Sequence, residues 1–263
     1  MLVGLRLGSV PPVPRRRWQT VVVRGAIWLG ATIALAACTG TNEPRYGMPA
    51  PATVQAHQTL YLWQGVFITA CVVAAIVWGL IIFSIIRYRR RPGDESLPKQ
   101  TQYHLPIEIT TTIIPIIMVA VVFFFVVKAE NIIDSTKATP AVSVKVEGFQ
   151  WGWRFTYLSP TGVALAPPIV GDEYSEPVLT LPAGETVRLQ LVSDDVIHSF
   201  YVPDFLFKRD LIPRVNNVVE LYIDKTGTFQ GHCAEFCGLD HAYMNFLVKA
   251  VPKDQFSVPG AAT

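Results

Sequence analysis

The sequence contains few charged residues. Asp, Glu, Lys and Arg make up 16% of its 263 positions, hydrophobic residues make up 51%, and the mean hydropathy is +0.35. A soluble globular domain carries about 25% charged residues, so this composition excludes a wholly soluble protein and indicates membrane-spanning segments. The formal net charge of +2 is too small to indicate nucleic-acid binding, and we expect no nucleic-acid partner.

Cysteine is also scarce, with four residues in the chain: Cys38, Cys71, Cys233 and Cys237. Cys38 ends an apolar run near the N-terminus. Cys71 lies inside a second apolar run, where it is interpreted as an ordinary small helix residue. Only Cys233 and Cys237 share a polar neighbourhood. The four cysteines therefore do not form one set, and each is interpreted in its own context.

The N-terminus has the parts of a secretory signal. A basic region with four arginines between residues 15 and 24 precedes the apolar run GAIWLGATIALAA, which ends in small residues before Cys38. The letters LAAC resemble the lipobox of bacterial lipoproteins, which is cleaved before a cysteine that is then lipidated. We predict a lipoprotein-type signal peptide over residues 1–37 and an outer N-terminal segment over 38–59. The alternative is an uncleaved anchor helix.

Two longer apolar runs predict a transmembrane helical hairpin over residues 60–128. Residues 60–86 contain no charge and residues 105–127 contain only Glu108, and both runs exceed the about 20 residues that a helix needs to cross the hydrocarbon core. The intervening loop, 87–104, carries five basic residues, which place it in the cytoplasm by the positive-inside rule. The remainder of the chain then lies on the outer face of the cell membrane.

Glu108 lies near the cytoplasmic end of the second run. One interpretation is a carboxylate that reaches back to interfacial water at little cost. The other is a proton-entry point or partner contact, because acidic groups inside spans often mark ion paths. These two interpretations stay open on the residues alone.

From about residue 140 the apolar residues alternate with polar ones, as in strands that are buried on one face. Six or seven short strands, without a convincing amphipathic helix, indicate an all-β sandwich or barrel over 140–252. Residues 253–263 are expected to form a disordered tail. The clearest predicted strands are 142–147, 186–192, 218–223 and 245–251.

The stretch GHCAEFCGLDHAYM gathers soft metal ligands, which are Cys233, Cys237, His241 and Met244. His198 stands upstream, at the end of another predicted strand. Thiolate and thioether ligands mixed with imidazole suit copper. One early histidine and a late loop of Cys, His and Met are typical of blue-copper domains, and two thiolates can bridge a pair of copper ions.

Two other sites stay open at this point. A disulfide between Cys233 and Cys237 fits an oxidising compartment but leaves the neighbouring histidine and methionine unexplained. Zinc could use both thiolates and His241, but it would have no use for Met244. The side chain of His232 should point away from that of Cys233 in an extended segment, so it is interpreted as structural.

These motifs together resemble subunit 2 of the haem–copper cytochrome c oxidases. The likeness rests on DVIHSFYVP and on the downstream pattern Cys-x-Glu-x-Cys-x3-His-x2-Met, and it covers about residues 55–252. It implies a two-helix transmembrane hairpin followed by an all-β cupredoxin domain. That domain would hold CuA, a mixed-valence centre of two copper ions.

The resemblance implies a role for each ligand. Cys233 and Cys237 would bridge both coppers, and His198 and His241 would each bind one copper through an imidazole nitrogen. Met244 would complete one copper through its sulfur. The other copper would be completed by the backbone carbonyl of the glutamate between the cysteines.

Three further roles come from the same resemblance. The side chain of that glutamate, Glu235, would bind a magnesium ion at the interface with the catalytic subunit. Trp151, in FQWGWRF, would receive electrons near the docking surface, although ordinary sandwich packing is the alternative for this residue. Glu108 would lie at the mouth of a proton channel.

The resemblance thus predicts the electron-entry subunit of a proton-translocating cytochrome c oxidase. Electrons from cytochrome c, or from a cytochrome c domain of a partner complex, would pass through CuA to the haem of catalytic subunit 1, where oxygen is reduced to water. No Cys-x-x-Cys-His haem-attachment motif occurs in the chain, so the donor is expected to be a separate protein. The alternatives are a copper-free quinol-oxidase relative and a membrane-anchored copper chaperone.

Overall fold

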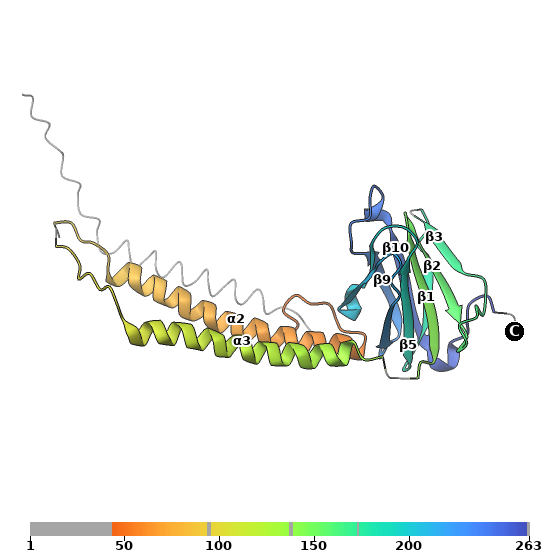
Figure 1. Cartoon of the computed structure of the whole chain (residues 1–263), viewed down its shortest axis with the longest axis horizontal. Coiled ribbons are helices and arrows are strands. Elements are labelled where there is room, and N and C mark those ends of the chain that lie inside the picture. Colours follow the sequence, from red (N-terminus) through yellow and green to blue (C-terminus); the bar gives the residue numbers. More distant parts are fainter. Residues whose placement is uncertain (1–43, 94–95, 137–138, 173, 262–263) are drawn as a thin grey trace, which may run out of the picture. The chain divides into compact units, whose positions relative to one another are not determined.

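The computed structural model of the chain describes residues 44–93, 96–136, 139–172 and 174–261. The predicted signal peptide and Cys38 lie outside these residues. Within the described part, two long helices are followed by ten strands and three short 3-10 helices (Figure 1). This order confirms the predicted hairpin followed by an all-β domain.

The two helices are α2, Val54–Arg87, and α3, Leu105–Ile133, and both are long and apolar enough to cross a membrane. They run antiparallel beside each other (Figure 1). Helix α2 begins before the predicted run because the Thr53 hydroxyl accepts a hydrogen bond from the Ala56 amide at 3.0 Å, which caps the helix. Pro115 lies inside α3 without ending it.

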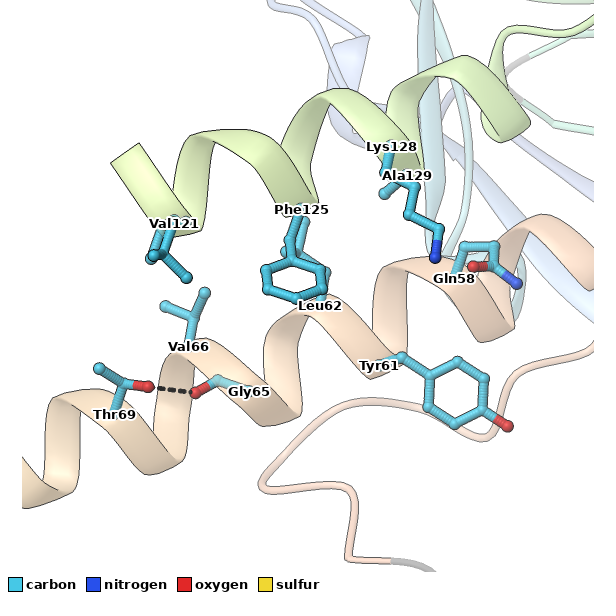
Figure 2. Close-up of a pocket in the computed structure, with 11 residues that line it drawn as sticks. Gln58, Tyr61, Leu62, Gly65, Val66, Thr69, Val121, Phe125, Lys128 and Ala129 are labelled. Carbon is cyan, nitrogen blue, oxygen red and sulfur yellow. Dashed lines mark hydrogen bonds between the residues drawn. The ribbon is translucent and has the colours of Figure 1, made fainter. Parts of the chain in front are cut away.

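An apolar groove lies between the two helices (Figure 2). Val121 and Phe125 of α3 point toward α2, with Phe125 beside Leu62. On α2, the Thr69 hydroxyl donates to the Gly65 carbonyl at 2.8 Å, so this polar side chain is satisfied within its own helix. None of the residues predicted to form a functional site lines this groove.

The ten strands form two five-stranded sheets that pack as a sandwich. The first sheet has the order β3-β2-β1-β5-β8 and the second the order β4-β10-β9-β6-β7. The strands of the first sheet are β1 (Val142–Phe149), β2 (Gly152–Leu158), β3 (Ile169–Asp172), β5 (Thr186–Ser193) and β8 (Asn217–Tyr222). Those of the second are β4 (Val178–Ala183), β6 (His198–Val202), β7 (Phe207–Leu211), β9 (Gly227–Cys233) and β10 (Asn245–Pro252).

The core lies between the sheets and is built from the alternation seen in the sequence. Val142, Val144 and Val146 of β1 are buried, and so are the alternate residues of β5. Aromatic rings fill the centre, where Trp153 meets Phe246 edge to face with ring centroids 5.0 Å apart.

Two expectations from the sequence differ from the structure. The described residues contain more strands than the predicted six or seven, because short strands such as Ile169–Asp172 and Phe207–Leu211 carry too few alternating residues to be recognised. The predicted disordered tail begins instead with a 3-10 helix, Lys253–Gln255, and Phe256 and Val258 then pack against the core. Two apolar side chains are enough to dock this segment.

Candidate metal centre

The second sheet brings the predicted ligands to one end of the sandwich. His198 is the first residue of β6, rather than the end of a strand as the sequence suggested, and Cys233 is the last residue of β9. These strands pair so that Phe200 lies opposite Cys233. Met244 directly precedes β10, and its carbonyl accepts a hydrogen bond from the Cys233 amide at 3.0 Å.

The side-chain donor atoms converge in this region. Cys233 Sγ lies 3.9 Å from His198 Nδ1 and 3.9 Å from Cys237 Sγ. Cys237 Sγ lies 3.5 Å from His241 Nδ1 and 3.9 Å from Met244 Sδ. All of these side chains are buried except that of His241, which is half-buried. The cluster therefore offers two cysteine sulfurs, two imidazoles and a thioether, and the donor atoms of His198, Cys233 and Cys237 all lie within 4.8 Å of one another.

The spacing of the two sulfurs fits ligands that share a metal. A disulfide requires about 2.0 Å between its sulfurs, whereas Cys233 and Cys237 are free cysteines with sulfurs 3.9 Å apart. Two sulfurs bound to one metal at about 2.3 Å with a near-tetrahedral angle stand about 3.8 Å apart. The backbone carbonyl of Glu235 lies 3.3 Å from Cys233 Sγ and adds an oxygen donor.

The pKa values of the two thiols are shifted in opposite directions. Burial raises the pKa of Cys233, but hydrogen bonds with His198 and with the backbone of Glu235 and Ser199 outweigh it and bring the pKa to about 7. Burial, and then the negative charge of the Cys233 thiolate, raise the pKa of Cys237 to about 12. Ionisation of one thiol therefore disfavours ionisation of the other, because two like charges would lie close together.

Asp195 orients the first histidine. Its Oδ1 lies 2.8 Å from His198 Nε2, so His198 can donate from Nε2 and leave Nδ1 facing Cys233. Burial raises the pKa of Asp195, but hydrogen bonds from His198 and from the amides of Val196 and Gln150 hold it below its ordinary value. The carboxylate thus stays charged beside the imidazole and fixes its orientation.

We expect Asp195→Ala to weaken metal binding by about 10–100-fold, the usual cost of removing the hydrogen-bond partner of a ligating histidine. Copper affinity of the full-length protein in detergent, measured by competition with a chelator, checks this. Asp254→Ala, which alters an exposed aspartate of the C-terminal 3-10 helix, is the matched control. Equal affinities for the two variants would contradict the role of Asp195.

The turn between β1 and β2 contacts the loop that carries Cys237. Trp151 Nε1 donates to the Cys237 carbonyl at 3.1 Å, and Gln150 Nε2 donates to the same oxygen at 2.8 Å. Trp151 also packs tightly on Gly238, where an added Cβ would lie 2.9 Å from the indole ring. Trp153, in contrast, is fully buried in the core. The half-exposed side chain of Trp151 therefore connects the surface of the sandwich to the loop that carries Cys237.

Glu235 and Glu108 each have a partner. Lys208 Nζ lies 3.2 Å from Glu235 Oε2, so the side chain predicted to bind magnesium is paired with a lysine in this structure. The Glu108 carboxylate accepts a hydrogen bond at 2.9 Å from the backbone amide of His104, the residue that precedes α3. Glu108 lies far along the chain from the sulfur cluster and takes no part in it.

His232 does not join the ligands. Its Nδ1 lies 2.8 Å from the Asn245 side-chain oxygen, across the paired strands β9 and β10. This contact agrees with the structural role expected from an extended segment, in which His232 and Cys233 point to opposite faces.

The sequence did not single out Asp195 or Gln150. A signal for Asp195 was available, because an acidic residue three positions before a candidate ligand can turn back onto the imidazole. For Gln150 there was none, since its contact depends on how the β1–β2 turn meets a loop 87 residues away in sequence.

Comparisons with known proteins agree on one family. Residues 142–251 match the model described as cytochrome c oxidase subunit II, periplasmic domain. The chain is 38% identical to a probable cytochrome c oxidase subunit 2 of Streptomyces coelicolor, over 92% of this chain and 86% of that protein. It is 33% identical to cytochrome c oxidase subunit 2 of Mycobacterium bovis, over 88% and 78%.

A solved structure is also similar. The periplasmic domain of subunit II of cytochrome oxidase from Bradyrhizobium japonicum is 30% identical, with a TM-score of 0.40, and the match covers 45% of this chain and 89% of that one.

Proposed function

The chain belongs to the cytochrome c oxidase subunit 2 family, and we propose that it is the electron-entry subunit of such an oxidase. The observation that carries this proposal is the convergence of two cysteine sulfurs, two imidazoles and a thioether, in which each of these donor atoms lies 3.5–3.9 Å from a cysteine sulfur. A subunit of this family works with other oxidase subunits in an oxidoreductase complex. We propose that the substrate on the outer side is reduced cytochrome c.

The proposed cofactor is the dinuclear copper centre CuA. When bound, it supplies one-electron transfer with small changes in bond length, because charge is spread over two metals and two sulfurs. Cys233 and Cys237 would bridge the metals, and His198 and His241 would bind one metal each through the Nδ1 atoms that face the sulfurs. Met244 would complete one copper.

The sixth proposed ligand is the carbonyl of Glu235, supported by its place 3.3 Å from Cys233 Sγ. Its side chain would bind magnesium at the interface with the catalytic subunit only after leaving Lys208. An unpaired Lys208 would then have to move away from the incoming cation, because like charges repel.

The electron path proposed here enters at Trp151. Its indole lies between the half-exposed surface and the Cys237 carbonyl, so few bonds separate the ring from a bridging sulfur. Phe236 and Leu239 are 79% and 85% exposed on the ligand loop, which gives this end an apolar surface for a partner protein. The haem of the catalytic subunit would receive the electron next.

The membrane arrangement follows from the charge pattern. We propose that loop 87–104 faces the cytoplasm and the sandwich faces the outside of a bacterial cell, in line with the arginines that follow the first span. Glu108 would then lie at the cytoplasmic end of α3, at the mouth of a proton channel in a proton-translocating complex. Cleavage and lipidation at Cys38 complete the proposed topology.

Copper quantification with EPR spectroscopy on the purified full-length protein tests the proposed function. We expect two copper ions per chain and a spectrum of one electron shared equally between them. One labile copper would instead favour a copper chaperone, and no copper would favour a quinol-oxidase relative. Either result would overturn the proposal.

We expect Met244→Leu to keep both coppers while shifting the reduction potential and slowing electron transfer. The thioether is a weak ligand that tunes the potential more than it holds the metal. A redox titration of the copper absorption, beside a copper count, checks this. Loss of both coppers in the variant would contradict the assigned role of Met244.

A further inference from the structure

Gln150 contacts both segments that supply copper ligands. Its backbone amide donates to Asp195 Oδ2 at 2.7 Å, and Asp195 holds His198 through its other oxygen. Its side-chain amide donates to the Cys237 carbonyl at 2.8 Å. One residue of the β1–β2 turn thus joins the segment of the first histidine to the loop of the second cysteine.

The side-chain contact is directed rather than incidental. Gln150 is exposed, so its amide could be hydrated by bulk water, yet it turns inward onto a backbone oxygen that already accepts from Trp151. Gly238 follows Cys237 at φ +124°, a conformation that L side chains rarely adopt. An added Cβ there would lie 3.3 Å from Gln150 Nε2, so the loop is shaped to let the amide approach.

We propose that Gln150 is a positioning residue for the copper centre, acting through the Cys237 carbonyl. This inference rests on the proposed function, because it assumes that Cys237 bridges two coppers. Two donors on one carbonyl fix the peptide that follows Cys237 and thereby the direction of its Cα–Cβ bond. Gln150 thus sets where the bridging sulfur stands relative to Cys233 and His241.

The same hydrogen bond acts on the reduction potential. The negative end of the carbonyl dipole near the site stabilises the oxidised centre, which carries more positive charge. Each N–H donor offsets part of that dipole and so favours reduction. Removing the Gln150 donor should lower the potential, and the remaining bond from Trp151 should keep the change partial.

The test uses Gln150→Met in the full-length protein. Methionine has a similar length but no donor, and the backbone amide that bonds Asp195 is retained. We expect two coppers per chain, altered copper hyperfine splitting in the EPR spectrum and a lower reduction potential. Gln190→Met is the matched control, because Gln190 of β5 lines a cleft with Ser143 of β1 and Leu158 of β2. None of the proposed ligands lines this cleft. That control should leave spectrum and potential unchanged.

The outcomes separate the inference from the function on which it rests. A Gln150→Met protein with two coppers and an unaltered spectrum and potential overturns the inference and leaves the proposed function intact. A wild-type protein without paired copper overturns the proposed function, whatever the variant does. If Gln150→Met does not fold, Gln150→Leu decides in the same way, because leucine also lacks a side-chain donor and adds no charge.

Discussion

Replacing Cys233 or Cys237 by serine is expected to abolish the proposed delocalised copper centre. Each sulfur lies near the other and near one histidine, so a single remaining bridge cannot hold two metals equivalently. The loss of copper affinity should be larger than the loss of about 10–100-fold expected when only the hydrogen-bond partner of a ligating histidine is removed. Oxidation of cytochrome c by the assembled complex should fall to background.

EPR spectroscopy and copper quantification of the two serine variants provide the measurement. Cys71→Ser is the matched control, because Cys71 is an exposed residue of α2 that belongs to the first apolar span. It should keep two coppers and full turnover. An unchanged spectrum in the Cys233 or Cys237 variant would refute the bridging role.

The second large effect is expected from Trp151→Leu. Both coppers should be retained, because Gln150 still donates to the Cys237 carbonyl. The rate at which reduced cytochrome c delivers electrons should fall at least about tenfold, which corresponds to a rise of about 1.4 kcal/mol in the activation barrier. The reason is that the half-exposed side chain of Trp151 connects the surface of the sandwich to the ligand loop.

Stopped-flow reduction of the intact complex by cytochrome c measures this rate. Tyr174→Leu is the matched control, since Tyr174 is an aromatic residue that is 90% exposed before β4. Trp151→Phe should fall between Trp151→Leu and the wild type, because it keeps a ring but loses the Nε1 donor. A wild-type rate in Trp151→Leu with both coppers bound would exclude entry through this residue.

The fold was largely predictable because its signals are local. Long apolar runs gave both spans, and alternating valines and leucines gave strands such as 142–147 and 186–192. The helix and strand ends were harder, since caps such as Thr53 and side chains such as Phe256 act through contacts that only the folded chain reveals.

The predicted ligands shared a motif, and for that reason they could be proposed from sequence. Cys233, Cys237, His241 and Met244 lie within one short stretch of sequence, and His198 was recognisable from its own motif. Gln150, in contrast, bonds Asp195 and the Cys237 carbonyl, which are 45 and 87 residues away in the chain. Contacts of that kind depend on tertiary structure and leave no periodic signal.

We propose that electrons enter the oxidase through copper bound by this chain. Anaerobic rapid mixing of the assembled complex with reduced cytochrome c, followed at the copper and haem absorption bands, tests it most directly. We predict that the copper band is reduced first and the haem follows, and that haem reduction is lost in Cys237→Ser. Haem reduction at an unchanged rate, with the copper still oxidised or absent, would contradict the account.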